Sequence, residues 1–163
     1  RAIFNPSGNL IISGSKDSTI KFWDIRSSVC VKTIASHLGE VTSIEINSSG
    51  TLLLSASKDN CNRLWETGTA RPIIRFKGHQ NTSKNFVRAT FGADEALVIG
   101  GSEDGMVYIW DIETGALLNT LAGHSGMVYA TRWNQKKGML ASCSHDNTVK
   151  TWIYDPIRLG KLK

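Results

Sequence analysis

The sequence predicts an all-β fold made of four repeated units. In each of four copies an aspartate is followed six residues later by a tryptophan, and these tryptophans are spaced 42, 45 and 42 residues apart. Three of the four histidines keep the same period. A period of this length is typical of repeated units of four strands each. The four pairs are Asp17 and Trp23, Asp59 and Trp65, Asp104 and Trp110, and Asp146 and Trp152.

Each unit alternates short strand-like runs with polar turns. In the last copy, strands are expected at 127–133, 139–142 and 148–152, and turns lie between them at 134–138 and 145–147. Clusters of Asn, Asp, Ser and Gly supply the backbone angles that turns require. Further turns are expected at 5–8, 47–50 and 92–95, and further strands at 29–35, 71–77 and 116–122. No stretch has the pattern of a long amphipathic helix.

Three recurring motifs carry a resemblance to a known family. They are Gly-His at 78–79 and 123–124, Trp-Asp at 23–24 and 110–111, and Ser-x-Ser-x-Asp at 13–17, 55–59 and 142–146. With these motifs the chain resembles the WD-repeat β-propellers over essentially its whole length. The resemblance implies a propeller segment at 1–163, with about four four-stranded antiparallel blades. Its repeats are expected at about 1–36, 37–78, 79–123 and 124–155, and a basic tail at 156–163.

The number of repeats bears on the size of the parent fold. Four copies are fewer than the seven or eight blades usual in this family, and the chain begins at Arg1 inside its first strand. The resemblance therefore implies the C-terminal part of a larger, seven- or eight-bladed propeller. Unpaired strand edges at the ends of such a segment would be expected to be covered by other residues or by a partner.

The resemblance also implies a hydrogen-bonded chain of histidine, serine or threonine, aspartate and tryptophan in each blade. These donors and acceptors can satisfy one another when buried. The second and fourth copies are complete, the first lacks the histidine, and the third has Gly100 in place of the serine and three extra residues. We therefore expect an incomplete network in the third copy. The residues are Ser13, Asp17 and Trp23; His37, Ser55, Asp59 and Trp65; His79, Asp104 and Trp110; and His124, Ser142, Asp146 and Trp152.

An enzymatic function of the same residues is less well supported than a structural role. Histidine, serine and aspartate form hydrolase triads, but catalytic groups belong to one pocket and these recur in every unit. The glycine-rich stretch 100–105 lies between two expected strands and does not open a helix, as a nucleotide-binding loop would. Cys30, Cys61 and Cys143 include no Cys-x-x-Cys pair, so zinc binding is not expected. The sequence predicts no catalytic residue, metal, cofactor or small-molecule substrate.

Composition is consistent with a single globular domain inside the cell. The 163 residues are 40% hydrophobic and 20% charged, which suffices for one core. The odd number of cysteines, three, favours a reducing compartment. No signal peptide or long apolar run is present, so membrane insertion is not expected. We expect an intracellular location, in the cytoplasm, the nucleus or both.

The resemblance implies that partner proteins bind the narrow top face. The projecting positions precede the turn aspartate or lie three and five residues beyond the histidine, and they differ in every copy. Met127 and Tyr129 are favoured as anchors, although packing against a neighbouring blade is an equal alternative. An insertion at 80–84 is expected to lengthen a top loop, and it shifts the register of the third copy's candidate contacts, Asn85 and Val87. The candidates are Lys16, Glu40, Thr42, Lys58, Glu103, Met127, Tyr129 and His145.

Three functions remain open at this stage. The leading one is a non-enzymatic scaffold that binds peptides or protein loops within a multiprotein complex. The second is a substrate receptor of a cullin-RING ubiquitin ligase, because Trp23, Asp24 and Arg26 match a Trp-Asp-x-Arg adaptor box of some family members. The third is RNA association, motivated by a net charge of +5 and an isoelectric point near 9.2.

Overall fold

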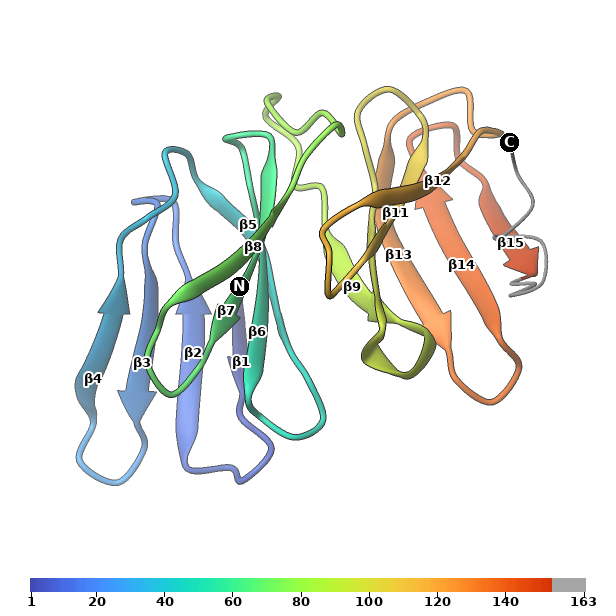
Figure 1. Ribbon diagram of the computed structural model, residues 1–163. Helices are drawn as coiled ribbons and strands as arrows, with labels where there is room; N and C mark the ends of the chain where they lie inside the picture. The colour runs from blue at the N-terminus through green and yellow to red at the C-terminus, as the bar shows by residue number, and fades with distance from the viewer. Residues whose placement is uncertain (154–163) are drawn as a thin grey trace.

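The computed structural model describes residues 1–153, which form four antiparallel sheets, or blades (Figure 1). Blade 1 contains β1 (Ala2–Phe4), β2 (Leu10–Gly14), β3 (Ile20–Asp24) and β4 (Val29–Ile34). Blade 2 contains β5 (Val41–Ile46), β6 (Leu52–Ser57), β7 (Cys61–Glu66) and β8 (Pro72–Phe76). Blade 3 contains β9 (Ala89–Gly92), β10 (Leu97–Gly100), β11 (Val107–Asp111) and β12 (Leu117–Leu121). Blade 4 contains β13 (Val128–Asn134), β14 (Met139–Ser144) and β15 (Val149–Ile153).

The prediction of an all-β fold with four blades is confirmed. Three blades have four strands, and blade 4 has three strands within the described residues. The basic tail expected at 156–163 lies outside those residues. The tight turn expected at 92–95 is instead a short 3-10 turn, η1 (Ala93–Glu95), in which Asp94 has φ 51°. No helix within residues 1–153 is long and apolar enough to cross a membrane.

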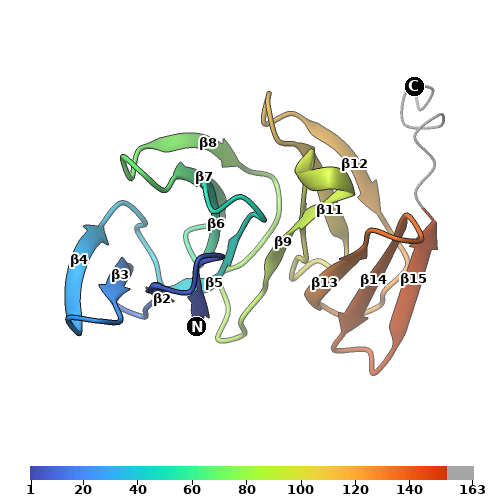
Figure 2. The ribbon, with the colours of Figure 1, turned by 90° about the horizontal axis from the view of Figure 1, so that it is seen from below.

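The blades stand side by side in an arc, with β5, β9 and β13 on the concave side (Figure 2). The fourth strands β4, β8 and β12 form the convex side. Neighbouring blades touch through the innermost strand of the later one, so β5 contacts β2, β9 contacts β5 and β6, and β13 contacts β9 and β10. The arrangement aligns the loops that precede β5, β9 and β13 on one narrow face, the upper one in Figure 1.

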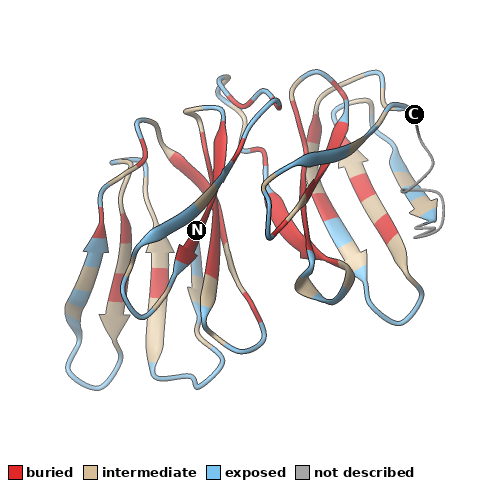
Figure 3. Ribbon diagram, in the orientation of Figure 1, coloured by how far each residue is buried: buried red, intermediate tan, exposed pale blue. Residues whose placement is uncertain are grey.

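The apolar core lies between the blades. Figure 3 shows the buried residues concentrated where sheets face one another. Ile12 and Phe22 of blade 1 pack with Trp65 of blade 2, and Phe76 of blade 2 packs in the next cluster with Trp110 of blade 3. The third cluster joins blades 3 and 4. Each unit buries its apolar face against its neighbour because a single small sheet cannot form a core alone.

Repeat networks and candidate binding face

Blade 2 contains a continuous hydrogen-bond chain. The Trp65 indole donates to Ser55 Oγ at 2.8 Å, and Ser55 Oγ lies 2.7 Å from His37 Nε2. His37 Nδ1 lies 2.9 Å from Asp59 Oδ2. Because the carboxylate can only accept, the imidazole carries a proton on Nδ1, and in the neutral ring Nε2 then accepts from the serine hydroxyl. The chain ties the loop before β5 to β6 and β7.

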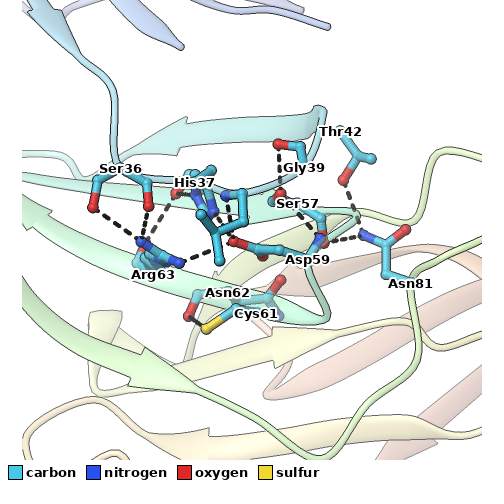
Figure 4. Close-up of polar contacts among 12 residues, drawn as sticks. Ser36, His37, Gly39, Thr42, Ser57, Asp59, Cys61, Asn62, Arg63 and Asn81 are labelled. Atoms are coloured by element: carbon cyan, nitrogen blue, oxygen red, sulfur yellow. Dashed lines mark hydrogen bonds and ion pairs between the residues drawn. The ribbon is translucent and has the colours of Figure 1, made fainter. Parts of the chain in front are cut away.

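Asp59 collects further donors (Figure 4). Its Oδ2 accepts from the backbone N–H of Leu38 at 3.1 Å and from Arg63 Nη2 at 2.9 Å, and Arg63 also bonds to Ser36. Burial raises the pKa of the carboxyl, but the bonds from His37 and Leu38 and the charge of Arg63 overcome it and hold the pKa of Asp59 at about 2. The Asp59 side chain is 7% exposed and that of Arg63 is 5% exposed, so this ion pair is shielded from water.

Blade 4 repeats the chain without the arginine. His124 bridges Asp146 Oδ2 at 2.9 Å and Ser142 Oγ at 2.8 Å, and the Trp152 indole donates to Ser142 Oγ at 2.9 Å. The hydrogen bond from Thr148, together with those from His124 and Ser125, lowers the pKa of Asp146. Lys150 stands where blade 2 has Arg63. The fourth-blade carboxylate is therefore held mainly by hydrogen bonds.

Blade 1 has a partial network. The Trp23 indole donates to Ser13 Oγ at 2.9 Å. Asp17 accepts from the backbone N–H of Thr19 at 3.0 Å and from its hydroxyl at 2.6 Å, and these bonds lower its pKa. Asp17 thus stabilises its own turn, and the described residues bring no histidine to it.

Blade 3 departs most from the repeat. His79 is 3% exposed, yet neither ring nitrogen has a hydrogen-bond partner among residues 1–153. Asp104 Oδ2 accepts instead from the Tyr108 hydroxyl at 2.7 Å, and the Trp110 indole donates to the Lys77 carbonyl at 3.1 Å. The structure therefore packs His79 against the Tyr108 and Trp110 rings without joining it to Asp104.

Asn62 of blade 2 explains why glycine occupies position 100. A Cβ on Gly100 would lie 2.9 Å from Asn62 Nδ2 and 3.1 Å from the Trp110 ring. Ile20, Val107 and Val149 occupy the equivalent position in the other blades. Asn62 is thus the polar residue at a position that is apolar in the other three blades, and this difference in the sequence could have indicated the contact with Gly100.

The burial of His79 predicts a pH dependence of stability. Burial lowers the pKa of His79 to about 4, against the opposing charges of Asp104 and Asp59. Because the unfolded state binds the proton more tightly, stability is highest above the unfolded pKa of about 6.5 and falls as pH drops towards the folded value. The loss at pH 5 relative to pH 8 is expected to be about 2 kcal/mol. Urea denaturation of wild type and His79→Leu at both pH values measures it, and an equal pH dependence in the two proteins would contradict the assignment.

On the top face, three predicted candidates, Lys16, Glu40 and Lys58, form a charge network across blades 1 and 2. Glu40 accepts from Lys58 Nζ at 2.6 Å and lies 3.7 Å from Lys16 Nζ. The hydrogen bond from Lys58 lowers the pKa of Glu40. Lys58 Nζ also lies 5.0 Å from the centre of the Phe86 ring, so these side chains are already engaged within the protein. The Lys58 side chain is partly buried, whereas that of Lys16 is 89% exposed, so the Lys16 contact contributes little stability.

The insertion at 80–84 folds down onto blade 2. Asn81 is fully buried and donates to Thr42 Oγ1 and the Ser57 carbonyl, both at 3.1 Å. Glu103 accepts from the backbone N–H groups of Thr82 at 2.9 Å and Ser83 at 2.7 Å. These bonds and those of the Thr82 and Ser83 side chains lower the pKa of Glu103 despite partial burial. Glu103 therefore holds the loop.

Two of the positions proposed from sequence as partner contacts, Thr42 and Val87, are buried. Thr42 is 5% exposed and donates to the Val87 carbonyl at 2.7 Å, and Val87 is 1% exposed. Both side chains are therefore buried within residues 1–153, and Asn81 of the insertion covers Thr42. Asn85 remains partly exposed and bonds to Ser83.

Of the remaining candidates, Tyr129 lines a pocket between blades 3 and 4, and Met127 and His145 lie next to it on blade 4. Tyr129 is half-buried, and its ring centre lies 6.1 Å from that of His145. Met127 is half-buried, and its carbonyl accepts from the His145 N–H at 2.9 Å. The pocket has a volume of about 520 Å³ and is lined by Lys84, Asn85, Phe86, Arg88, Tyr129, Ala130 and Cys143.

Phe86 was missed by the sequence reasoning. Its side chain is 55% exposed, and it follows directly on the insertion and Asn85. A large exposed aromatic residue beside a half-buried tyrosine is typical of a binding surface. Its place directly after a loop insertion could have indicated from the sequence that this aromatic residue is exposed.

The adaptor-box residues lie at the end of β3 and on the turn that leads to β4, at the lower end of blade 1 in Figure 1. Asp24 accepts from the Ser27 N–H at 2.9 Å and the Ser27 hydroxyl at 2.6 Å, and these bonds lower its pKa. The Trp23 indole bonds within the blade, whereas Arg26 is exposed. Use of this box stays a prediction.

Residues 1–153 hold no cluster of three His, Cys, Asp or Glu suited to a metal ion.

Comparison with known proteins agrees with this architecture. The family model described as "WD domain, G-beta repeat" matches residues 1–24, 28–66, 70–111 and 115–152. The chain belongs to this WD40 repeat family, whose members are generally non-catalytic interaction scaffolds. Each matched segment ends at or one residue beyond the repeat tryptophan.

Three relatives illustrate the range of proteins that share these repeats. The chain is 40% identical to the U5 small nuclear ribonucleoprotein 40 kDa protein of Dictyostelium discoideum, over 90% of the chain and 43% of that protein. It is 33% identical to the WD repeat-containing protein 26 homolog of Arabidopsis thaliana, over 92% of the chain and 26% of that protein. It is 36% identical to Periodic tryptophan protein 2 of Saccharomyces cerevisiae, over 91% of the chain and 16% of that protein. The chain thus spans less than half the length of each.

Proposed function

We propose that this protein is a non-catalytic β-propeller scaffold that binds a partner protein on the top face of blades 3 and 4. The observation that carries the proposal is the pocket between Phe86 and Tyr129, which combines an exposed aromatic side chain with a cavity of about 520 Å³. Aromatic anchors beside a concave surface are typical of interaction hot spots. Met127 and His145 extend this surface along blade 4.

The contrast between the repeated interior residues and the varied surface residues supports the proposal. The histidine, serine, aspartate and tryptophan residues engage one another inside blades 2 and 4, so they are not free for catalysis or ligand binding. The residues around the pocket differ from blade to blade. A scaffold needs both features, since a repeated interior fixes the frame and a varied surface selects the partner.

An affinity pull-down of the protein tests this function. Wild type is compared with Tyr129→Ala and Phe86→Ala, and the captured proteins are identified by mass spectrometry. We expect both variants to lose the same partners, with affinities reduced about tenfold or more, as for a hot-spot aromatic residue. The matched control is Ile73→Ala, which removes an exposed apolar side chain from β8 on the convex side. Loss of the same partners in the control, or unchanged partners in both variants with unchanged melting temperature, would contradict the proposal.

A narrower candidate is membership of a ribonucleoprotein complex, within the nucleus. It is favoured by the similarity to the U5 small nuclear ribonucleoprotein 40 kDa protein and by the net charge of +5. Purification of the complex with and without ribonuclease treatment tests it. Co-purifying RNA is expected under this candidate, and a complex free of RNA at low salt would contradict it.

A further inference from the structure

Arginine side chains from three blades meet on the concave side of the arc. Arg1, Arg88 and Arg132 line a pocket of about 290 Å³ together with Glu45. Arg132 Nη1 donates to Glu45 Oε1 at 2.8 Å, so the carboxylate is already engaged. Burial, and then the charges of Arg88 and Arg132, lower the pKa of Arg1 against the opposing effect of Glu45. The pocket therefore carries an excess of positive charge.

This pocket adjoins the one on the top face. Arg88, Ala130 and Cys143 line both cavities, so a continuous surface runs from Phe86 and Tyr129 down to the arginines. Within residues 1–153, the side chains of Arg88 and Lys84 make no hydrogen bond or ion pair. The nearby top-face carboxylates are engaged elsewhere, since Glu40 pairs with Lys58 and Glu103 holds the insertion. We call the two adjoining cavities the Arg88 pocket.

We infer that the Arg88 pocket binds an acidic segment of a partner protein, with an Asp or Glu carboxylate at Arg88 and a neighbouring apolar side chain against Phe86 and Tyr129. This inference rests on the proposed function and specifies the chemistry of the partner. A guanidinium in a cleft with an excess of positive charge attracts a carboxylate and can bind it through two parallel hydrogen bonds. The aromatic rings supply the apolar contact area.

The geometry favours a peptide over single-stranded RNA. Binding of RNA needs cations along a track of phosphates and open aromatic faces on which bases can stack. Here the cations converge on one pocket, Lys58 already lies over the Phe86 ring at 5.0 Å, and His145 lies beside the Tyr129 ring. A short peptide needs one carboxylate contact and one apolar contact, and the pocket provides both.

Selection from a phage-displayed library of random linear peptides on the immobilised protein tests the inference. We expect the selected peptides to be enriched in Asp and Glu next to Leu, Ile or Phe. The dissociation constant of one labelled selected peptide is then measured by fluorescence anisotropy. Arg88→Gln is expected to raise it about tenfold, as for loss of a hydrogen bond between charged groups. Arg88→Lys is expected to have a smaller effect, since it keeps the charge and loses the bidentate geometry.

Arg75→Gln is the matched control. It removes the same charge from an exposed position on β8 and is expected to change the dissociation constant less than about twofold, the effect of an exposed charge. Selection without acidic enrichment, or equal weakening by Arg75→Gln, would overturn the inference. So would tighter binding of an oligouridine RNA or a phosphoserine peptide than of the acidic peptide. If natural partners are lost in Tyr129→Ala but retained in Arg88→Gln, the proposed function stands and the acidic specificity fails.

Discussion

Replacement of Asp59 by alanine is expected to destabilise the protein by about 3–5 kcal/mol, the usual cost of removing one partner from a buried ion pair. Asp59 Oδ2 accepts from His37, Leu38 and Arg63. Arg63 is 4% exposed, so its charge would be left in the protein interior without a counterion. The His37 Nδ1–H and the Leu38 N–H would lose their acceptor at the same time.

Chemical denaturation of Asp59→Ala, Asp146→Ala and Asp17→Ala, each compared with wild type, measures this effect. Asp146 has the same histidine contact but no arginine, and Asp17 bonds within its own turn. We therefore expect the loss to be largest for Asp59, smaller for Asp146 and smallest for Asp17. Equal losses in the three variants would show that the Asp59–Arg63 pair has no special role in stability.

The second large effect is expected from Gly101→Ala, which should destabilise the protein by about 3 kcal/mol through overpacking. A Cβ at this position would lie 2.2 Å from the Val128 carbonyl oxygen. This oxygen belongs to the backbone, so it cannot move aside as a side chain could. The same residue is fixed to blade 3, because the Val128 N–H donates to the Ser102 carbonyl at 2.9 Å. The first strand of blade 4 would have to move away from blade 3, which would weaken the bond to Ser102 and the apolar contacts between the two blades.

Gly68→Ala provides the control for this prediction. Gly68 lies in the turn after β7, has no atom within 4 Å of an added Cβ and does not have a positive φ. Its replacement is expected to change stability by less than about 0.5 kcal/mol, as for most surface substitutions. Thermal melts of the two variants compare them directly. A Gly101→Ala protein as stable as the Gly68→Ala protein would mean that the blades are not closely packed at Val128.

The fold was predictable from the sequence because its signals are local and repeated. Each blade has a tryptophan at a fixed distance from its turn aspartate, and polar turn residues separate short strands. The predicted strands 139–142 and 148–152 correspond to β14 (Met139–Ser144) and β15 (Val149–Ile153) within two residues. Positions such as these depend on side-chain periodicity within one segment.

The features that sequence reasoning missed depend on contacts between blades. Asn62 and Gly100 are far apart in the chain, and their close approach explains why the third network differs. The burial of Thr42 likewise depends on the path of the insertion over blade 2. Neither relation is visible in the repeat pattern, because a pattern within one unit does not specify what an adjoining unit places against it.

The pocket beside Phe86 is the central element of the proposed function, and site-specific photo-crosslinking tests it most directly. A benzophenone amino acid replaces Phe86 in the protein within cells, and a matched protein carries it at Ile73 on the convex strand β8. Both positions are exposed apolar residues, so both variants are expected to fold. The account predicts a specific crosslinked partner from position 86 and none of that identity from position 73. Crosslinking of the same partner from position 73 alone would place the interface on the convex side and contradict the account.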